Sequence, residues 1–282
     1  MSVEFSVAQK QRLTELNGSE DLCARSFDDA KEREKCFKQE ERALIDENKD
    51  ALFALKDKGN RPLLCEIETR LVNWLTGDEG FTQVVTPVIL PASMLAKMTI
   101  GADHPLSKQV FWLDAKKCLR PMLAPNLYDV MRSLQKVWGN PVRIFESGPC
   151  FRKESQGAMH LNEFTMLNFV ELGGVKEGEQ MARLEELAHR AMAAIGISSE
   201  DYKLVKEKSE VYGETLDIEV KGMEVASGAY GPHFLDDQWG IFDTWVGIGF
   251  GLERIAMVMQ DYRNIKRVGR SLSYLNGARL NI

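Results

Sequence analysis

Apolar residues recur at helical spacing in three parts of the chain. This period predicts helices over residues 63–75, 125–138 and 177–197. The second of these starts with a proline, a residue that favours the first turn of a helix. The third has one apolar side, formed by Met181, Leu184, Leu187, Ala188 and Met192. Because its other side is polar, this helix is expected to cover a sheet.

Other segments alternate between apolar and polar residues, which predicts β-strands. A long hairpin is expected to join residues 141–155 to residues 160–172 through a turn at Gln156-Gly157, and a second hairpin covers 214–231 with its turn at Lys221-Gly222. The remaining predicted strands are 81–91, which Pro87 interrupts, 110–113, 118–119 and 245–251, which runs straight into a helix. Strands joined mainly by hairpins predict an α+β fold, an antiparallel sheet flanked by helices.

The first 60 residues differ in composition from the rest. They intersperse charges of both signs among good helix formers and end at Gly59 and Pro62, which predicts a helical extension. We therefore expect a helical extension over residues 1–60 and a main domain over 61–282. A chain of 282 residues with 44% hydrophobic residues has ample material for a core.

Charge and cysteine usage exclude some classes of protein. The net charge of -6 gives the whole chain no nucleic-acid-binding signature. From Tyr262 to Ile282 the chain carries five cations and no acidic residue, so this tail is a candidate for phosphate contacts, although a solvated segment explains it equally well. Five widely spaced cysteines without a C-x-x-C pair argue against a disulfide framework and a zinc site. No apolar run approaches the ~20 residues of a membrane span and no signal peptide is evident, so a cytoplasmic location is expected.

The long hairpin collects unusual chemistry on one face. Side chains two apart share a face of a strand, so Arg152 and Glu154 lie on one side and Lys153 on the other. On the returning strand, Phe164, Met166, Asn168 and Val170 form one set. A guanidinium, a carboxylate, a ring and an amide would then lie together. The alternative is a solvated hairpin tip with incidental charges.

The strand at 245–251 has one face almost without side chains. Trp245 is followed at every second position by Gly247, Gly249 and Gly251, which suggests close approach of a ligand or of another element. The helix that follows directs its N-terminus and Arg254 to the same place, which favours an anion. The G-x-G-x-G spacing does not fit a dinucleotide-binding G-x-G-x-x-G loop. Together with the hairpin, this strand indicates a site for a nucleoside triphosphate.

These segments resemble the three signature motifs of class II aminoacyl-tRNA synthetases. The helix with "GFTQVVTPVILP" resembles the first motif, "FRKES" with "HLNEFTML" the second, and "GFGLER" the third. The similarity is greater to the pyrrolysyl-tRNA synthetase family, through "LRPMLAPNLY", "VYGETLD" and "RSLSYLNG" in the same order, over about residues 63–281. The resemblance implies a ligase that activates an amino acid with ATP and transfers it to tRNA.

The resemblance also implies roles at the ATP site. Arg152 and Arg254 are the candidate catalytic residues, because in-line attack on a phosphate needs positive charge and geometry rather than a proton-transfer group. The residues implied to bind ATP are Arg152, Glu154, His160, Leu161, Phe164, Glu224, Ser227 and Arg254. Glu224 and Ser227 match the family's magnesium-contacting pair. Their spacing along a strand needs a bulge to bring both side chains to one ion.

An apolar pocket for the amino acid is implied by the same resemblance. Its implied residues are Met122, Leu123, Ala124, Leu127, Tyr128, Met131, Asn168, Val170, Tyr212, Trp245 and Gly247. Core packing explains most of these equally well. Asn168 is more telling, because a buried amide needs a partner and would recognise the substrate's side-chain carbonyl. Tyr212 would cover the pyrroline ring, and the small Ala124 leaves room for a long lysine derivative.

The implied partners are pyrrolysine or a related Nε-acylated lysine, a cognate tRNA and a second copy of the chain, because the first motif builds the dimer interface in this class. The chain begins almost at the catalytic part, so the resemblance implies either a separate tRNA-binding protein, as in bacterial members, or an enzyme that works without one, as in some archaeal members. The segment "RKESQGAMHLNEF" is similar to bacterial members, which favours the separate protein. Two alternatives stay open. One is another class II activity, such as a phenylalanine enzyme or one that modifies a protein lysine, and the other is a non-catalytic tRNA-binding paralogue.

Overall fold

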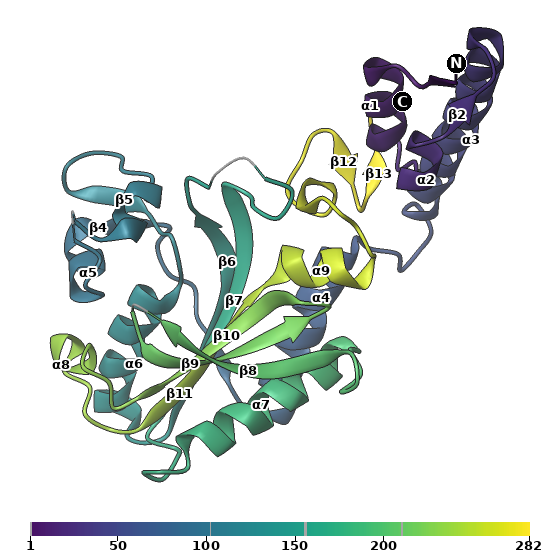
Figure 1. The fold of residues 1–282 in the computed structure, drawn as a ribbon. Coiled ribbons are helices and arrows are strands. Elements are labelled where there is room, and N and C mark those ends of the chain that lie inside the picture. The colour runs from purple at the N-terminus through teal and green to yellow at the C-terminus, as the bar shows by residue number, and fades with distance from the viewer. Residues whose placement is uncertain (1, 102, 155–156, 210) are drawn as a thin grey trace. The chain divides into compact units, whose positions relative to one another are not determined.

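The computed structural model describes residues 2–101, 103–154, 157–209 and 211–282. The chain forms two compact units (Figure 1). The smaller unit combines the residues up to Leu63 with Lys266–Ile282, and the larger unit is Leu64–Ile265. Within the described ranges, no helix is both long enough and apolar enough to cross a membrane.

The smaller unit is built on three helices and two short antiparallel pairs. Its elements are α1 (Val7–Glu15), α2 (Glu20–Cys23), α3 (Ala30–Ala54), β1 (Val3–Glu4) with β2 (Ser26–Phe27), and β12 (Tyr274–Leu275) with β13 (Ala278–Arg279). The buried Asn48 of α3 joins its parts: its Nδ2 donates to the carbonyl oxygens of Leu16 and Leu44, and its Oδ1 accepts from the main-chain nitrogen of Arg279 at 2.6 Å. A buried amide is thus fully used in structure.

The last residues of the chain pack on the N-terminal helices, although the sequence predicted them within the main domain of 61–282. The guanidinium of Arg279 pairs with Glu15 at 3.2 Å and lies 5.0 Å from the ring centre of Tyr274. Arg267 donates to the carbonyl oxygen of Thr14 at 2.7 Å. These two cations of the basic tail therefore have structural partners inside the smaller unit.

The larger unit is organised by one seven-stranded sheet. Its strands, in spatial order, are β3 (Thr82–Gln83), β6 (Val142–Phe151), β7 (Glu163–Leu172), β11 (Trp245–Gly251), β10 (Met223–Gly231), β9 (Gly213–Val220) and β8 (Tyr202–Ser209). Every neighbouring pair is antiparallel except β3 with β6, which is parallel. The predicted α+β fold, an antiparallel-dominated sheet with flanking helices, is confirmed.

Helices cover both faces of the sheet. On one face lie α4 (Leu63–Asn73), which ends in a π-helical turn at Trp74–Asp78, and α7 (Gln180–Ile195). Phe169 of β7 points to this face and meets Trp74 edge to face, with ring centres 5.9 Å apart. On the other face α6 (Ala124–Trp138) packs against β6 and β7 beside Ile144 and Val170. Further short elements are α5 (Ala92–Lys97), α8 (Asp236–Trp239), α9 (Leu252–Met259), the pair of β4 (Ile89–Pro91) with β5 (Lys117–Leu119), and two 3-10 helices at Pro105–Gln109 and Ile265–Arg267.

Three strand predictions need correction. Residues 110–113 form no strand, and only Trp112 makes an isolated bridge, to Cys118. Strand β6 ends at Phe151, so the charged residues 152–154 lie in the following loop rather than in the hairpin, and the predicted turn residue Gln156 is outside the described residues. Strand β8 was not predicted at all. Its mixed charges match an edge strand, where packing does not demand an apolar pattern.

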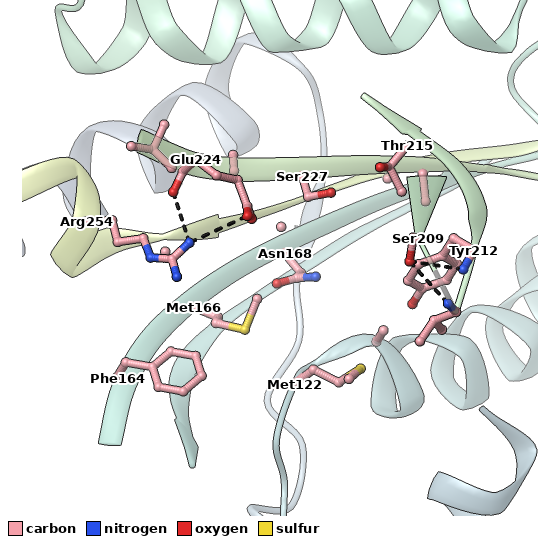
Figure 2. A pocket seen from close by; sticks show the side chains of 18 of the residues that line it. Met122, Phe164, Met166, Asn168, Ser209, Tyr212, Thr215, Glu224, Ser227 and Arg254 are labelled. Atoms are coloured by element: carbon pink, nitrogen blue, oxygen red, sulfur yellow. Dashed lines mark hydrogen bonds and ion pairs between the residues drawn. The ribbon is translucent and has the colours of Figure 1, made fainter. Parts of the chain in front are cut away.

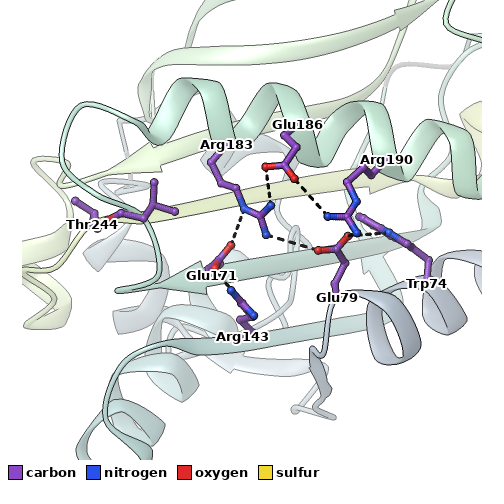
Figure 3. Close-up of polar contacts among 9 residues, drawn as sticks. Trp74, Glu79, Arg143, Glu171, Arg183, Glu186, Arg190 and Thr244 are labelled. Atoms are coloured by element: carbon purple, nitrogen blue, oxygen red, sulfur yellow. Dashed lines mark hydrogen bonds and ion pairs between the residues drawn. The ribbon is translucent and has the colours of Figure 1, made fainter.

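Charged side chains hold α7 on its face of the sheet (Figure 3). The fully buried Glu171 of β7 accepts from Arg143 at 2.7 Å and from Arg183 of α7 at 3.0 Å. Glu79 accepts from the indole of Trp74 at 3.1 Å and pairs with Arg190 of α7 at 2.6 Å. We call these side chains, with Glu186 of α7, the α7 network. Each buried carboxylate in it is paired, as buried charges require.

Candidate active site

A cavity of about 370 Å³ opens on the sheet face that α6 covers (Figure 2). Its walls come from α6, β7, β9, β10, β11, the first turn of α9 and the loops around residues 159–161 and 209–212. All but one of the sequence-predicted site residues line it: Met122, Ala124, Leu127, Tyr128, Met131, Arg152, Glu154, His160, Leu161, Phe164, Asn168, Val170, Tyr212, Glu224, Ser227, Trp245, Gly247 and Arg254. The exception is Leu123, which is fully buried in the core behind this wall.

The floor of the cavity is the bare face of β11. In the sheet register, Gly247, Gly249 and Gly251 stand opposite Val170, Asn168 and Met166 of β7. A Cβ atom at Gly249 would lie 2.7 Å from the Asn168 amide, and a Cβ atom at Gly247 would lie 2.8 Å from the carbonyl oxygen of Phe169. A Cβ atom at Gly251 would make only ordinary van der Waals contacts. Two of the three glycines are thus required by protein neighbours, and all three keep the floor open.

Arg152 enters the cavity from the loop after β6. Its Nε donates to the carbonyl oxygen of Pro121 at 2.9 Å, and its guanidinium lies 5.3 Å from the ring centre of Phe164. Burial lowers the pKa of this arginine, yet the group stays charged because its ordinary pKa is far above neutrality. In the described part of the chain its side chain makes no other hydrogen bond, so both Nη groups can receive an anion.

Arg254, in the first turn of α9, faces Glu224 of β10 (Figure 2). Its Nη1 donates to the carbonyl oxygen of Glu224 at 3.0 Å and lies 3.7 Å from the carboxylate. Burial raises the pKa of Glu224, and the charge of Arg254 opposes that rise. The pair therefore places one cation and one carboxylate at the same end of the cavity.

The predicted bulge between Glu224 and Ser227 is present. The pairing of β10 with β9 shifts register between Glu224 and Ala226, so both predicted metal contacts line the cavity. Ser227 donates to Oδ1 of Asp217 at 2.5 Å, and the charge of Asp217 helps to raise the pKa of Glu224. A cation would relieve the repulsion between these two carboxylates, so the residues fit a hard divalent ion such as Mg²⁺.

This oxygen set is too small to hold an ion by itself. The described residues contain no cluster of three or more histidine, cysteine, aspartate or glutamate side chains suited to a metal. Mg²⁺ is commonly bound by one or two carboxylates together with substrate phosphates and water. The site therefore fits an ion that arrives with a phosphorylated substrate.

Other predicted residues surround Arg152 in the loop between β6 and β7. The main-chain nitrogen of Glu154 donates to Asn162 Oδ1 at 3.1 Å, and Arg152 and Asn162 continue the strand pairing at 3.0 Å. His160 and Leu161 line the same part of the cavity. Lys153 turns away, over the ring of Phe111. The predicted division of these side chains between two faces is thus found, although the strand ends before them.

The opposite end of the cavity is aromatic. Tyr128 of α6 stacks on Trp239 of α8 with ring centres 5.3 Å apart and meets Trp245 edge to face at 5.6 Å. The ring centre of Tyr212 lies 6.4 Å from that of Trp245. Burial raises the pKa of Tyr212, which keeps its hydroxyl neutral. Leu127 and Met131 of α6 complete an apolar wall.

A polar group stands among these apolar walls. Oδ1 of Asn168 is buried and has no hydrogen-bond partner among the described residues. A buried amide oxygen without a partner costs free energy, on the order of 1 to 3 kcal/mol. Its position at the cavity surface means that a bound molecule can supply the missing partner.

Several lining residues were not predicted from the sequence. They include Leu106, Met159, Phe169, Ser209, Val211, Thr215, Val225, Ala226, Ala229, Glu253 and Ile265. Ser209 has a clear local role, because its hydroxyl accepts from the main-chain nitrogens of Val211 and Tyr212 and so fixes the turn that carries Tyr212 (Figure 2). One signal was available, because a polar Ser209 two and three residues before Val211 and Tyr212 is typical of a turn.

Comparison with known proteins agrees with this geometry. Residues 25–276 match the family model described as tRNA synthetases class II core domain (F). A crystal structure of pyrrolysyl-tRNA synthetase from Desulfitobacterium hafniense is 52% identical, with a TM-score of 0.91 and 100% of each chain covered. A second structure of a pyrrolysyl-tRNA synthetase from that organism is also 52% identical, with a TM-score of 0.90, 100% of this chain and 99% of that chain covered.

The similarity spans both the bare strand and the charged loop that line the cavity, and it covers the chain from end to end. Class II synthetases are ligases. The chain therefore belongs to the class II aminoacyl-tRNA synthetases and, within them, to the pyrrolysyl-tRNA synthetase family.

Proposed function

We propose that this chain activates pyrrolysine, or a related Nε-acylated lysine, with ATP and transfers the activated amino acid to a cognate tRNA. The observation that carries the proposal is one cavity with two chemically different ends. Arg152, Arg254 and Glu224 lie at one end, and Tyr128 and Trp245 at the other. The amide of Asn168, whose Oδ1 has no hydrogen-bond partner among the described residues, lies on the floor between them.

The charged end suits ATP. The guanidinium of Arg152 neutralises the α-phosphate and the substrate carboxylate, and Arg254 neutralises the rest of the triphosphate. Phe164 offers its ring to the adenine, while Glu154 accepts from the adenine amino group and His160 and Leu161 enclose it. The positions of Arg152 over Phe164 and of Arg254 at the N-terminus of α9 support these roles.

Glu224 and Ser227, assisted by Asp217, would hold Mg²⁺ against the phosphates of bound ATP. The ion supplies positive charge to the phosphate oxygens. In the free protein Arg254 lies on Glu224, so this arginine keeps the carboxylate neutralised until substrate arrives.

The reaction needs two displacements. The substrate carboxylate oxygen attacks the α-phosphorus, the bond to the bridging oxygen breaks, and pyrophosphate leaves. A ribose hydroxyl of the tRNA then attacks the carbonyl carbon, and AMP leaves. The chain's own contribution to the first step is to hold the two anions together at Arg152 and to stabilise the charge that develops. No side chain is assigned as a base.

The aromatic end suits the side chain of a long lysine derivative. Nδ2 of Asn168 would donate to the acyl carbonyl oxygen, and Oδ1 would accept from the acyl N–H. Tyr212 would cover the ring, and the aliphatic part would be surrounded by Trp245, Tyr128 and Val170. The further wall residues are Met122, Ala124, Leu127, Met131 and Gly247, with Leu123 supporting them from the core. Such a pocket discriminates best where a buried polar group would otherwise stay unpaired.

The proposal is tested by ATP-pyrophosphate exchange with the purified chain alone. Exchange is expected with pyrrolysine or an acylated lysine, and the assay needs no tRNA. Exchange that depends on a standard amino acid instead would assign another class II activity. An absence of exchange with every amino acid would favour a non-catalytic tRNA-binding role.

The variant Asn168→Ala tests the pocket. It should lower kcat/KM for the acylated lysine about 5- to 150-fold, because leaving a buried polar group of the substrate without its partner costs roughly 1 to 3 kcal/mol. The KM for ATP should stay the same, which exchange at varied ATP measures. Unchanged activity toward the lysine derivative would remove Asn168 from the pocket assignment.

The proposed function includes a homodimer and a tRNA, and it includes a separate tRNA-binding protein as a further partner. Tail residues 266–282 and the helices of the smaller unit are the proposed tRNA-contacting part. Light scattering of the purified chain tests for the homodimer. Charging assays, with and without a second protein, test for the tRNA and the separate tRNA-binding protein as partners. The proposed location is the cytoplasm, where tRNA is charged.

A further inference from the structure

The segment between β10 and β11 supports the aromatic end of the cavity from outside. It contains α8 and leads directly into Trp245. Asp236, the first residue of α8, is only 1% exposed although it is an acid. It is not among the residues that line the cavity, but its side chain bonds to Trp245, which does line it.

Two hydrogen bonds converge on one oxygen of Asp236. Oδ2 accepts from the indole Nε1 of Trp245 at 2.8 Å and from the main-chain nitrogen of His233 at 2.5 Å. Gly231 makes the same place tight, because a Cβ at this position would overlap both the indole and Oδ2 of Asp236. The indole is thus held between a buried carboxylate and a bare backbone.

The second oxygen of Asp236 lies near another cavity residue. Oδ1 of Asp236 and the hydroxyl of Tyr128 are both buried without a hydrogen-bond partner among the described residues. Burial, followed by the nearby Tyr212 and Asp236, raises the pKa of Tyr128, so the carboxylate acts on this tyrosine at short range. The Tyr128 ring also touches Trp239 and Trp245. The indole of Trp245 therefore depends directly on the place of Asp236, and the Tyr128 ring depends on it through its edge-to-face contact with Trp245.

We propose that Asp236 is a positioning residue of the amino-acid pocket, which fixes the indole of Trp245 and sets the space between Trp245 and Tyr128. That space is where a bulky acyl group on a lysine side chain would lie. The inference rests on the proposed function. It adds a residue, Asp236, that does not touch the substrate but determines which sizes of acyl group the pocket accepts.

The variant Asp236→Ala tests it by ATP-pyrophosphate exchange with a bulky Nε-acylated lysine. The indole N–H then loses its acceptor in a buried place, and we expect about a tenfold rise in the KM for the amino acid. The KM for ATP should not change. Asp236→Asn keeps an oxygen acceptor for the indole and should restore most of the affinity. Asp237→Ala, an exposed neighbour in the same helix, is the matched control and should leave both constants unchanged.

A second background shows whether Asp236 acts through the indole. Trp245→Phe removes the N–H donor, so adding Asp236→Ala to it should raise the KM for the amino acid much less than it does in the unmodified chain, because only the bond to the main-chain nitrogen of His233 is lost in both backgrounds. This double variant loses both the donor and its acceptor, which keeps the test available if Asp236→Ala alone does not fold. An equal rise in both backgrounds contradicts the inference.

Other outcomes separate the two proposals. If the unmodified chain exchanges with no lysine derivative, the proposed function fails. If it does exchange, and Asp236→Ala changes neither KM or raises both equally, the proposed function stands and the positioning role of Asp236 is overturned. A changed ratio of kcat/KM between a bulky and a small acyl group supports it, because a merely structural role would not alter that ratio.

Discussion

Strand β7 carries two polar residues that meet opposite environments on the two faces of the sheet. Glu171 points to the α7 face, where both its carboxylate oxygens accept from arginines. Asn168 points to the cavity, where its Oδ1 has no partner within the described ranges. The same contrast holds for the groups around them. The α7 network pairs each buried carboxylate at short range, with Glu79 and Arg190 at 2.6 Å, whereas Arg254 and Glu224 on the cavity face are paired at 3.7 Å.

The difference separates polar groups that stabilise the fold from those that await a ligand. A buried polar group with all its partners costs little, whereas one without partners costs about 1 to 3 kcal/mol until a molecule binds. Folding of the larger unit tolerates such groups on the cavity face because its other face and core supply stability. An unpaired buried group that also lines a cavity is therefore a better pointer to the site than charge alone. Burial without a partner is not sufficient, because Oδ1 of Asn17 shares it and lies outside the cavity.

The largest effect is expected at Arg152. Arg152→Ala should lower kcat/KM about a thousandfold, close to 4 kcal/mol of transition-state stabilisation, because one cation serves both reacting anions. The free energy of unfolding of this variant should equal or exceed that of the unmodified chain, because a buried cation is removed. Pyrophosphate exchange and urea unfolding measure the two quantities. Lys153→Ala, on the exposed neighbour, is the control, and a large loss of stability in Arg152→Ala would break the contrast between the faces.

Glu171 should show the reverse behaviour. Glu171→Ala leaves the guanidinium groups of Arg143 and Arg183 without their shared partner and should lower the free energy of unfolding by about 3 kcal/mol. Activity per folded molecule should change little, because Glu171 faces away from the cavity. Denaturant unfolding, followed by exchange assays at low temperature, measures this. Loss of activity without loss of stability would place Glu171 in the working site instead.

The smallest effect is expected at Glu186, which is half exposed within the α7 network. Hydrogen bonding to Arg183 lowers the pKa of Glu186 below its ordinary value of 4.5. A lowered acid pKa stabilises the fold above 4.5 and loses that stabilisation as pH falls through the folded-state pKa. Glu186→Gln should therefore be destabilised by less than about 1 kcal/mol at pH 7. The difference should vanish at low pH in unfolding curves, and a difference that grows on acidification would contradict this sign.

The sequence predicted the α+β class, the hairpin of β9 with β10 and the strand-to-helix passage of β11 into α9, because each has a strong local period or turn signal. Lys221 and Gly222 both adopt positive φ at the predicted turn. It failed at 110–113 and at β8, where composition is mixed and pairing with a neighbour decides the conformation. The site residues followed mostly from motif resemblance, and residues such as Glu253 and Ser209 were missed because no pattern singled them out.

By itself, the sequence determined which residues alternate on each strand, where glycines clear the floor of the cavity and which family the chain resembles. These properties are local or belong to short motifs, so they survive without knowledge of neighbours. Only the tertiary structure decided that Oδ1 of Asn168 has no partner in the described part of the chain, that Asp236 holds Trp245, and that residues 266–282 pack on the N-terminal helices. Each of these depends on contacts between segments far apart in the chain, and burial and hydrogen bonding there are set by packing rather than by local pattern.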